Sequence, residues 1–376
     1  MPERFFVPQL DGLRFLAFVM VFYVHSAAER SSPWFHGTWL TGSFGVDLFF
    51  VLSSFLITSL LLREQDARGG YLDVKSFWIR RALRIWPLYF AFVAGSAIVE
   101  QLPGWYVLGL ETFTLNWLTA FSYAVPSWTL ILWSVSMEEQ FYLVWPLIVR
   151  FVSRDRLPWM CVGMIAFSVG ARAILIGTVS DWSTAATARQ SHYMLWNFTL
   201  TRLDPLAVGA LVAWLWRVRP WTVAIPTPIG ILGLLAAVVM LQRYFPVDQP
   251  GWHQVWIYLA VAIVLGGVVA ITFARSTSIL TLPAMVYLGQ ISYGLYVFHI
   301  FAAVTVAHVA GSIWWPIRLP LTFGVTLACA ALSYRWLEQP FLQFKARFTH
   351  IPSSPIYGAT QTQGFSVHRR RPSLSQ

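Results

Sequence analysis

The sequence predicts an all-α membrane protein, a polytopic transmembrane bundle of about ten helices with both termini in the cytoplasm. Two observations support this prediction. Of the 376 residues, 57% are hydrophobic and only 11% are charged, and the mean hydropathy is +0.60. That composition is too apolar for the surface of a soluble domain. In addition, apolar stretches of about 20 residues, long enough to cross a hydrocarbon layer of roughly 30 Å, recur along the whole chain.

The candidate membrane spans follow one another up to residue 337. They cover residues 8–28, 43–62, 82–101, 128–149, 158–177, 197–216, 221–241, 254–274, 281–309 and 316–337. Segment 105–124 is long enough to span, but it carries Glu111 and Asn116. If that segment does not span, the basic residues between the spans gather on one side, which the positive-inside rule places in the cytoplasm. An even number of spans then puts both termini on that side.

The formal net charge of +10 comes mostly from arginine, since Lys75 and Lys345 are the only lysines. Because the basic residues gather between the spans, the charge indicates orientation in a membrane rather than binding of nucleic acid. From His350 onward the chain is polar, rich in Pro, Ser and Gly, and basic. We therefore expect residues 1–342 to form the membrane domain and residues 343–376 a disordered cytoplasmic tail.

Ionisable side chains inside the spans are candidate functional residues, because a buried charge is costly in a membrane unless it is paired or faces a cavity. In the first span, Arg14 and His25 are eleven residues apart, which on a helix gives nearly the same face at a separation of roughly 16 Å. Asp11 offers Arg14 an ion pair, which competes with a ligand-binding role. His25 titrates near neutral pH and is the candidate general base. Asp47 either orients His25 or pairs with another buried donor.

Two further stretches carry charge into the third and fourth spans. FWIRRALRIWPLY contains Arg80, Arg81 and Arg84, which either anchor the span at the cytoplasmic edge or capture a phosphorylated ligand. WSVSMEEQFYLVWP contains Glu138 and Glu139. Because adjacent residues point about 100° apart on a helix, we expect one glutamate to face a cavity and the other a packing partner or the interface.

Polar groups recur in the later spans. RLDPLAVGALVAW contains Arg202 and Asp204, and GQISYGLYVFHI contains Tyr296 and His299. A histidine among apolar residues, such as His299, is commonly a core residue with its hydrogen bonds satisfied. The closing stretch YRWLEQPFL places an arginine and a glutamate three residues apart, which predicts an ion pair on one helix face. No phosphate-binding glycine loop and no clustered Cys/His metal site is found in the sequence.

The signature blocks of the acyltransferase-3 family of membrane O-acyltransferases resemble six stretches of this chain in the same order: LDGLRFLAFVMVFYVH, FGVDLFFVLSSFLI, FWIRRALRIWPLYF, WSVSMEEQFYLVWP, LDPLAVGALVAW and ISYGLYVFHI. The resemblance covers nearly the whole chain up to residue 342. It implies a helical membrane enzyme that moves an acyl group, usually acetyl, from cytoplasmic acyl-CoA to a hydroxyl group. Family acceptors are mostly cell-envelope glycans, with some small molecules such as macrolides.

The resemblance also assigns residues. The family's motifs fall on one arginine–histidine pair, one basic cluster and one glutamate of this chain: Arg14, His25, Arg80, Arg81, Arg84 and Glu138. The family commonly has Gly where this chain has Ser54, which is still small enough for close helix packing. Many relatives also carry a C-terminal hydrolase-like domain that helps transfer to the acceptor, and we expect none in this chain. We therefore expect this chain to act alone or with a separate partner.

The expected mechanism uses acyl-CoA as a co-substrate, with no metal and no permanently bound cofactor. The base takes the proton of the acceptor hydroxyl as that oxygen attacks the thioester directly, although an acyl-histidine intermediate stays open. The candidate catalytic residues are His25, Glu138, Asp47 and Arg14, with the carboxylates orienting the histidine. The candidate residues for the CoA phosphates are Arg80, Arg81 and Arg84. The candidate substrate-binding residues are Arg202, Asp204, His299 and Tyr296.

The expected partners are acyl-CoA, a glycan or other hydroxyl-bearing acceptor, and the lipid bilayer of a bacterial plasma membrane, without nucleic acid. The sequence leaves open whether two copies form a homodimer. A proton-coupled secondary transporter is the alternative function, because membrane-embedded His, Asp, Glu and Arg also relay protons. A non-catalytic scaffold is a second alternative, and it predicts that His25→Ala would reduce stability rather than chemistry.

Overall fold

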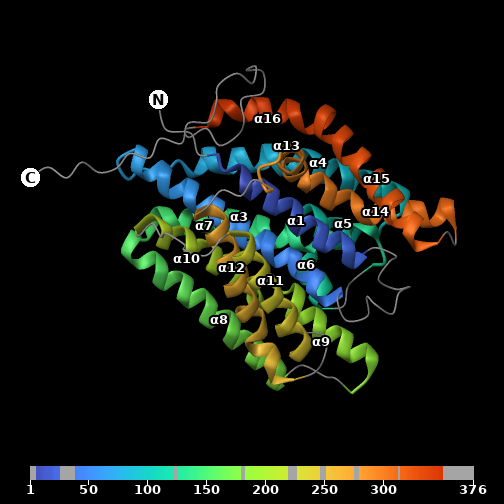
Figure 1. Ribbon diagram of the computed structural model, residues 1–376, viewed down its shortest axis with the longest axis horizontal. Helices are drawn as coiled ribbons and strands as arrows, with labels where there is room; N and C mark the ends of the chain where they lie inside the picture. Colours follow the sequence, from blue (N-terminus) through green and yellow to red (C-terminus); the bar gives the residue numbers. More distant parts are fainter. Residues whose placement is uncertain are drawn as a thin grey trace, which may run out of the picture.

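The computed structural model describes residues 6–25, 39–121, 125–178, 183–218, 227–245, 251–274, 279–311 and 314–349. Every regular element in these ranges is a helix (Figure 1). The α-helices are α1 (Pro8–His25), α3 (Trp39–Ala67), α4 (Val74–Val99), α5 (Gly104–Glu111), α6 (Leu115–Ala120), α7 (Trp133–Phe151), α8 (Leu157–Thr178), α9 (Ala185–Asn197), α10 (Asp204–Val218), α11 (Thr227–Tyr244), α12 (Ile257–Ala274), α13 (Pro283–Gln290), α14 (Ser292–Ala310), α15 (Trp315–Ser333) and α16 (Gln339–Lys345).

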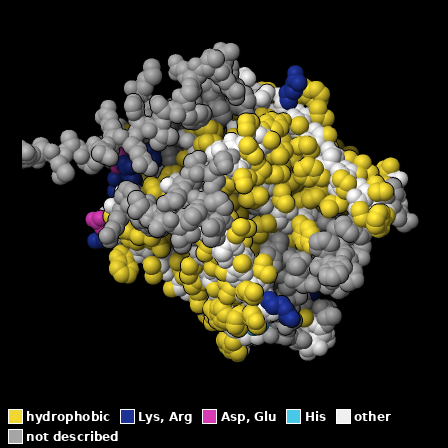
Figure 2. Space-filling view, in the orientation of Figure 1, with side chains coloured by type: hydrophobic (Ala, Val, Ile, Leu, Met, Phe, Trp, Pro, Cys, Tyr) yellow, Lys and Arg dark blue, Asp and Glu magenta, His cyan; other side chains and the backbone are white. Residues whose placement is uncertain are grey.

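Six helical stretches among the described residues are long and apolar enough to cross a membrane: Phe44–Ala67, Val74–Val99, Arg154–Thr178, Ile257–Ala274, Ser292–Ala310 and Pro316–Lys345. Hydrophobic side chains cover much of the face seen in Figure 2, as contact with lipid requires. The chain is therefore an all-helical membrane protein. Each of the ten predicted spans overlaps a helix, while the number of crossings and the side of the termini stay predictions.

Segment 105–124 differs from the spans around it. The structure forms two short helices there, α5 with 8 residues and α6 with 6. A helix rises about 1.5 Å per residue, so neither can cross a hydrocarbon layer. This agrees with the prediction that the segment does not span. The predicted span 281–309, in contrast, is broken at Ile291 into α13 and α14.

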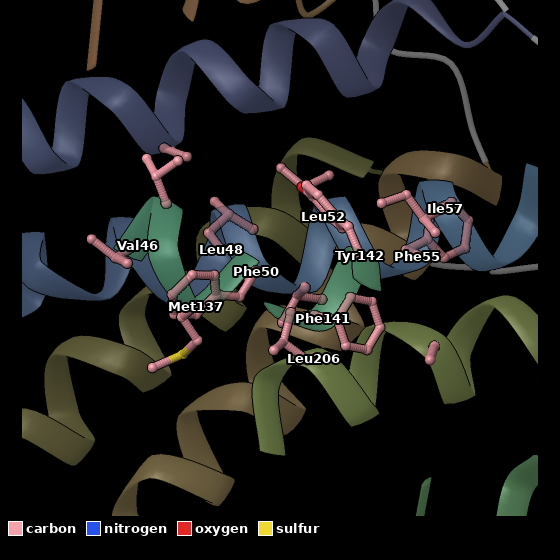
Figure 3. Close-up of a cluster of buried hydrophobic side chains, with 14 of the residues drawn as sticks. Val46, Leu48, Phe50, Leu52, Phe55, Ile57, Met137, Phe141, Tyr142 and Leu206 are labelled. Atoms are coloured by element: carbon pink, nitrogen blue, oxygen red, sulfur yellow. The ribbon is translucent and has the colours of Figure 1, made fainter. Parts of the chain in front are cut away.

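Helix α3 lies at the centre of the bundle. It packs against α1, α7, α10 and α12, with α8, α10, α11 and α12 on one side of it in Figure 1 and α4 and the C-terminal helices on the other. Figure 3 shows side chains of α3 in one buried cluster with residues of α7 and α10: Val46, Leu48, Phe50, Leu52, Phe55, Ile57, Met137, Phe141, Tyr142 and Leu206. A helix buried on all sides needs no polar face, which explains why residues 44–62 are mostly apolar, with Asp47 as the one charged residue.

At Gly209, the backbone of α10 lies against both the backbone and a side chain of α3. A Cβ atom there would overlap the carbonyl oxygen of Val51 and the hydroxyl of Ser54. The Ser54 hydroxyl donates to that same carbonyl at 3.2 Å. Small residues at helix crossings allow this close approach. Ser54 therefore has the packing role that the sequence predicted for it.

The first helix is seated in the same way against the region before α14. A Cβ at Gly12 would overlap the carbonyl of Leu280, and a Cβ at Gly289 would overlap the carbonyl of Asp11. Both glycines permit backbone-to-backbone contact between α1 and the α13 region. This contact fixes the position of α1, which carries Arg14 and ends at His25.

After α15 the chain folds back onto α4. A π-helix, η6 (Tyr334–Glu338), leads into α16 and a 3₁₀ turn, η7 (Ala346–Phe348), and all three contact α4. Arg80 Nη1 donates to the carbonyl of Phe348 at 2.7 Å. The prediction of a disordered tail from residue 343 is therefore wrong for residues 343–348, which are helical. Residues 350–376 lie outside the described part of the chain.

The π-helix also overturns the predicted ion pair between Arg335 and Glu338. Positions three apart share a face in an α-helix, but the wider π-helical turn separates them. Arg335 is exposed, whereas Glu338 is buried and accepts a hydrogen bond from Ser333 at 3.4 Å. Glu338 therefore points inward.

Candidate active site

A cavity that is partly open to the outside lies among α1, α3, α4, α7 and α14. Its wall contains polar and charged side chains from all five helices: Arg14, Ser53, Arg81, Arg84, Ser134, Glu138, Tyr142, Ser292, Tyr293 and Tyr296. The cavity thus brings together residues from several motifs that are far apart in the sequence.

Two of the three arginines of α4 line the cavity, and the third does not. Arg81 and Arg84 are on the wall, whereas Arg80 Nη2 pairs with Glu64 at 3.0 Å. Neighbouring helix positions point about 100° apart, so Arg80 and Arg81 cannot share one site. The structure therefore corrects the expectation for Arg80, which holds the C-terminal segment instead of facing the cavity. Arg81 Nε is buried and has no hydrogen-bond partner among the described residues.

Arg14 forms the predicted pair with Asp11 and also lines the cavity, while its ligand-binding role stays a prediction. Its guanidinium lines the cavity, and its Nη1 lies 3.5 Å from Oδ1 of Asp11, one turn earlier. A single carboxylate at that distance leaves several of the five guanidinium N–H donors for other partners. Arg14 therefore stays able to meet a ligand in the cavity.

A short hydrogen-bond chain crosses the cavity wall. Tyr142 donates its hydroxyl proton to Oε2 of Glu138 at 2.9 Å, so the hydrogen bond between Tyr142 and Ser53 takes its proton from Ser53. Glu139 lies on another face and accepts a hydrogen bond from Trp86 Nε1 at 3.0 Å. This confirms that one glutamate faces the cavity and the other a packing partner. The sequence does not single out Ser53 for this wall, because a small uncharged residue in an apolar run gives no such signal.

His25 lies against a second histidine at the end of α1. His299 Nδ1 is 2.5 Å from the carbonyl oxygen of Tyr296 and can only donate to it, so His299 Nε2 carries the lone pair of the neutral ring. That nitrogen is 3.1 Å from His25 Nδ1. His25 Nδ1, which is also 3.0 Å from the carbonyl of Val21, is therefore the donor. This tautomer puts the lone pair of His25 on Nε2.

The histidine pair connects to the cavity through Tyr296. The Tyr296 hydroxyl lines the cavity, lies 2.6 Å from the Ser134 hydroxyl and donates to the carbonyl of Ile131 at 2.9 Å. His299 is 1% exposed, whereas the His25 side chain is exposed. His299 is thus the group that orients His25, a role that the sequence had given to Asp47 or Glu138.

Asp47 has another partner. Its Oδ1 forms an ion pair with Arg202 Nη2, and its Oδ2 has no hydrogen-bond partner among the described residues. The Arg202 guanidinium also lies over the rings of Trp196 and Tyr258, 4.4 and 4.6 Å from their centroids. The second alternative for Asp47, a pair with another buried donor, is therefore the one that the structure has.

A second ion pair adjoins the first. Arg172 Nη1 and Nη2 each donate to one oxygen of Asp204 at 3.1 Å, and Arg172 Nε donates to the carbonyl of Val255 at 3.0 Å. Arg172, Arg202 and Asp204 are all 0% exposed. Arg202 and Asp204 therefore lie in a buried four-charge cluster and not on the cavity wall, which corrects their assignment to substrate. Arg172 was missed, although a charge inside the apolar run 158–177 is the signal that could have found it.

Comparison with known proteins identifies the family of this chain. The family model described as an acyltransferase domain, acyltransferase 3, matches residues 7–335. The chain therefore belongs to the acyltransferase-3 family, a family of acyltransferase enzymes. No solved structure matches the chain. Among the described residues, no group of three or more His, Cys, Asp or Glu side chains is placed to hold a metal ion.

Curated relatives come from Staphylococcus aureus. The chain is 29% identical to "Putative O-acetyltransferase SACOL0978" of strain COL, over 89% of this chain and 57% of that protein. It is 28% identical to "O-acetyltransferase OatA" of strain NCTC 8325 / PS 47, over 92% of this chain and 59% of that protein. The chain thus spans less than two thirds of the length of these relatives.

Proposed function

We propose that this protein transfers an acetyl group from cytoplasmic acetyl-CoA to a hydroxyl of a cell-envelope glycan in a bacterial plasma membrane. The observation that carries the proposal is the cavity that joins Arg14, Arg81, Arg84 and Glu138. The relatives named as O-acetyltransferases support acetyl as the group transferred.

The arginines support a phosphorylated donor. Arg81 and Arg84 of α4 and Arg14 of α1 all line the cavity, and guanidinium groups bind phosphate oxygens through paired hydrogen bonds. The buried Nε of Arg81 is one donor that a ligand would satisfy. We assign the phosphates to Arg81 and Arg84, and the pantetheine arm or the oxyanion to Arg14.

His25 acts as the general base in this proposal. Its Nε2 takes the proton of the acceptor hydroxyl while the hydroxyl oxygen attacks the thioester carbonyl carbon. The carbon–sulfur bond then breaks, and the CoA thiolate leaves and takes up the proton from His25. His299 keeps the other ring nitrogen protonated, so that the lone pair stays on Nε2.

The acceptor reaches His25 from the exposed side of that residue. The His25 side chain is exposed while Arg14 faces the interior cavity, so donor and acceptor approach opposite ends of one helix. A hydroxyl on a surface glycan fits this arrangement, because it needs no entry into the bundle. The resemblance of the six sequence blocks supports a glycan as the acceptor class.

The test is release of free CoA from acetyl-CoA by the purified protein in nanodiscs, with and without a glycan extract. We expect turnover by the wild type and a loss of about 10²- to 10⁴-fold in His25→Ala at unchanged thermal stability. His308→Ala, which alters an exposed histidine on α14, is the matched control. Arg81→Ala should raise the KM for acetyl-CoA more than Arg80→Ala, because Arg80 is held by Glu64.

Two results would contradict the proposal. If no acyl-CoA gives CoA release, a transporter becomes the better explanation of the buried charges. If His25→Ala loses stability and activity together, the histidine is a structural residue and not the base.

A further inference from the structure

The segment η6–α16–η7, residues 334–348, lies over the part of α4 that carries the arginines. It is attached near both ends. At its end, the carbonyl of Phe348 accepts a hydrogen bond from Arg80 at 2.7 Å. At its start, Glu338 is 4% exposed and is attracted electrostatically to Arg84. The segment therefore covers one helical turn of α4, from Arg80 to Arg84.

Lys345 is the last residue of α16 and lies between these attachment points. Its ammonium group repels the guanidinium groups of Arg84, Arg81, Arg80 and Arg14. In the described part of the chain, no hydrogen bond or ion pair joins Lys345, Arg81 or Arg84 to a carboxylate. Like charges this close are costly in a poorly solvated site unless an anion shares them.

Arg80 and Arg14, in the same region, each form an ion pair with a carboxylate. Arg80 has Glu64 at 3.0 Å, and Arg14 has Asp11 at 3.5 Å. Arg81, Arg84 and Lys345 have no such ion pair, and the two arginines line the cavity. The three groups thus belong to two helices, α4 and α16, that pack against each other.

We propose that Lys345 is a further binding residue for the phosphate groups of the acyl-CoA donor, and that segment 334–348 completes the donor site. The inference rests on the proposed function, which supplies a donor with several phosphates. An ammonium group is a compact charge with three donors and complements the planar guanidinium fork on a phosphate. A bound polyphosphate would replace repulsion among the cations by attraction to the ligand.

The chain offers an unusually direct test, because Lys345 and Lys75 are its only lysines. Reductive methylation of the protein in nanodiscs, read by mass spectrometry, reports the two lysines separately. Lys75 is exposed at the start of α4 and serves as the internal control. We expect free CoA to slow the labelling of Lys345 about tenfold, the scale of one charge-assisted hydrogen bond, and to leave Lys75 unchanged.

Calorimetry on the same samples separates the two proposals. If CoA binds and Lys345 is labelled at an unchanged rate, the role of Lys345 is wrong while the proposed function stands. If CoA does not bind at all, both fail. The comparison is made in phosphatidylcholine nanodiscs with and without phosphatidylglycerol. Protection by phosphatidylglycerol alone, with no added effect of CoA, would make this a lipid-headgroup site and overturn the proposal.

Variants provide a second readout that does not depend on labelling. Lys345→Ala should raise the KM for acetyl-CoA about tenfold and change kcat by less than about twofold, since a ground-state contact to the donor is lost. Lys345→Arg should stay near the wild type, and Lys75→Ala should have no effect. An unchanged KM in a well-folded Lys345→Ala protein would refute the assignment.

Discussion

Replacing Asp47 by asparagine removes one of the four charges in the buried cluster, and we expect a large loss of stability. Asp47 is 1% exposed and its partner Arg202 is 0% exposed. In the wild type, Arg202 Nε and Nη1 already have no hydrogen-bond partner among the described residues. Loss of the carboxylate charge would leave this guanidinium with the rings of Trp196 and Tyr258 and with Asp204, which is already paired with Arg172.

The magnitude follows from the burial of the pair. Breaking a buried ion pair by removing one partner costs about 3–5 kcal/mol, because an uncompensated charge stays behind. That is a change of roughly a hundred- to several-thousand-fold in the unfolding equilibrium. Replacing Asp47 and Arg202 together by leucine should cost less than the single change, since both charges disappear.

The assay is the free energy of unfolding in mixed micelles of a mild detergent and SDS, with CoA release measured on the same samples. Asp66→Asn is the matched control, because Asp66 pairs with Arg154 and Arg217, both 44% exposed. Such exposed pairs contribute about 1 kcal/mol or less. A loss below about 1 kcal/mol in Asp47→Asn would refute this reasoning. Lost turnover at full stability would show instead that Asp47 acts in the chemistry.

Two other predictions concern the histidine pair and the α3–α10 contact. His299→Ala should lower kcat about 10- to 100-fold by removing the group that fixes the tautomer of His25. His299→Gln should restore part of the lost kcat, because its amide can donate to the Tyr296 carbonyl and accept from His25. Equal kcat values for the two variants would contradict the tautomer role. Gly209→Ala should destabilise the protein by about 1–3 kcal/mol, because the new methyl group overlaps α3. Gly163→Ala, where a Cβ meets nothing within 4 Å, should be neutral or slightly stabilising, and similar unfolding energies for the two would argue against the close contact.

The helices could be predicted from the sequence because lipid imposes a simple rule on the chain. Apolar runs of the right length mark them, and each predicted span overlaps a helix. The break at Ile291 and the two short helices α5 and α6 depend on local packing instead, which hydropathy does not record. The sequence does not reveal that segment 343–348 is helical, because its anchor is a hydrogen bond from Arg80 to the carbonyl of Phe348, 268 residues away.

The candidate site was predicted in part for the same kind of reason. Arg14 and Glu138 stand out because charges are rare in apolar runs, and both line the cavity. Ser53 and Tyr142 carry no charge, so nothing in the sequence separates them from packing residues. The partner of Asp47 lies 155 residues away in Arg202. Such a pairing depends on which two helix faces meet in the bundle, and a single sequence does not show which faces meet.

The glycine contacts at Gly12 and Gly289 give the first helix a mechanical role. A helix seated backbone to backbone at two glycines has little room to slide, so the span from Arg14 to His25 is a fixed length of roughly 16 Å. Under the proposed function, this length separates the residues assigned to the donor from the residue assigned to deprotonate the acceptor. The proposal therefore requires a donor that carries its acyl group on an arm of matching reach. A short acyl phosphate bound at the same arginines would stop before His25, whereas a thioester on a long flexible arm would arrive.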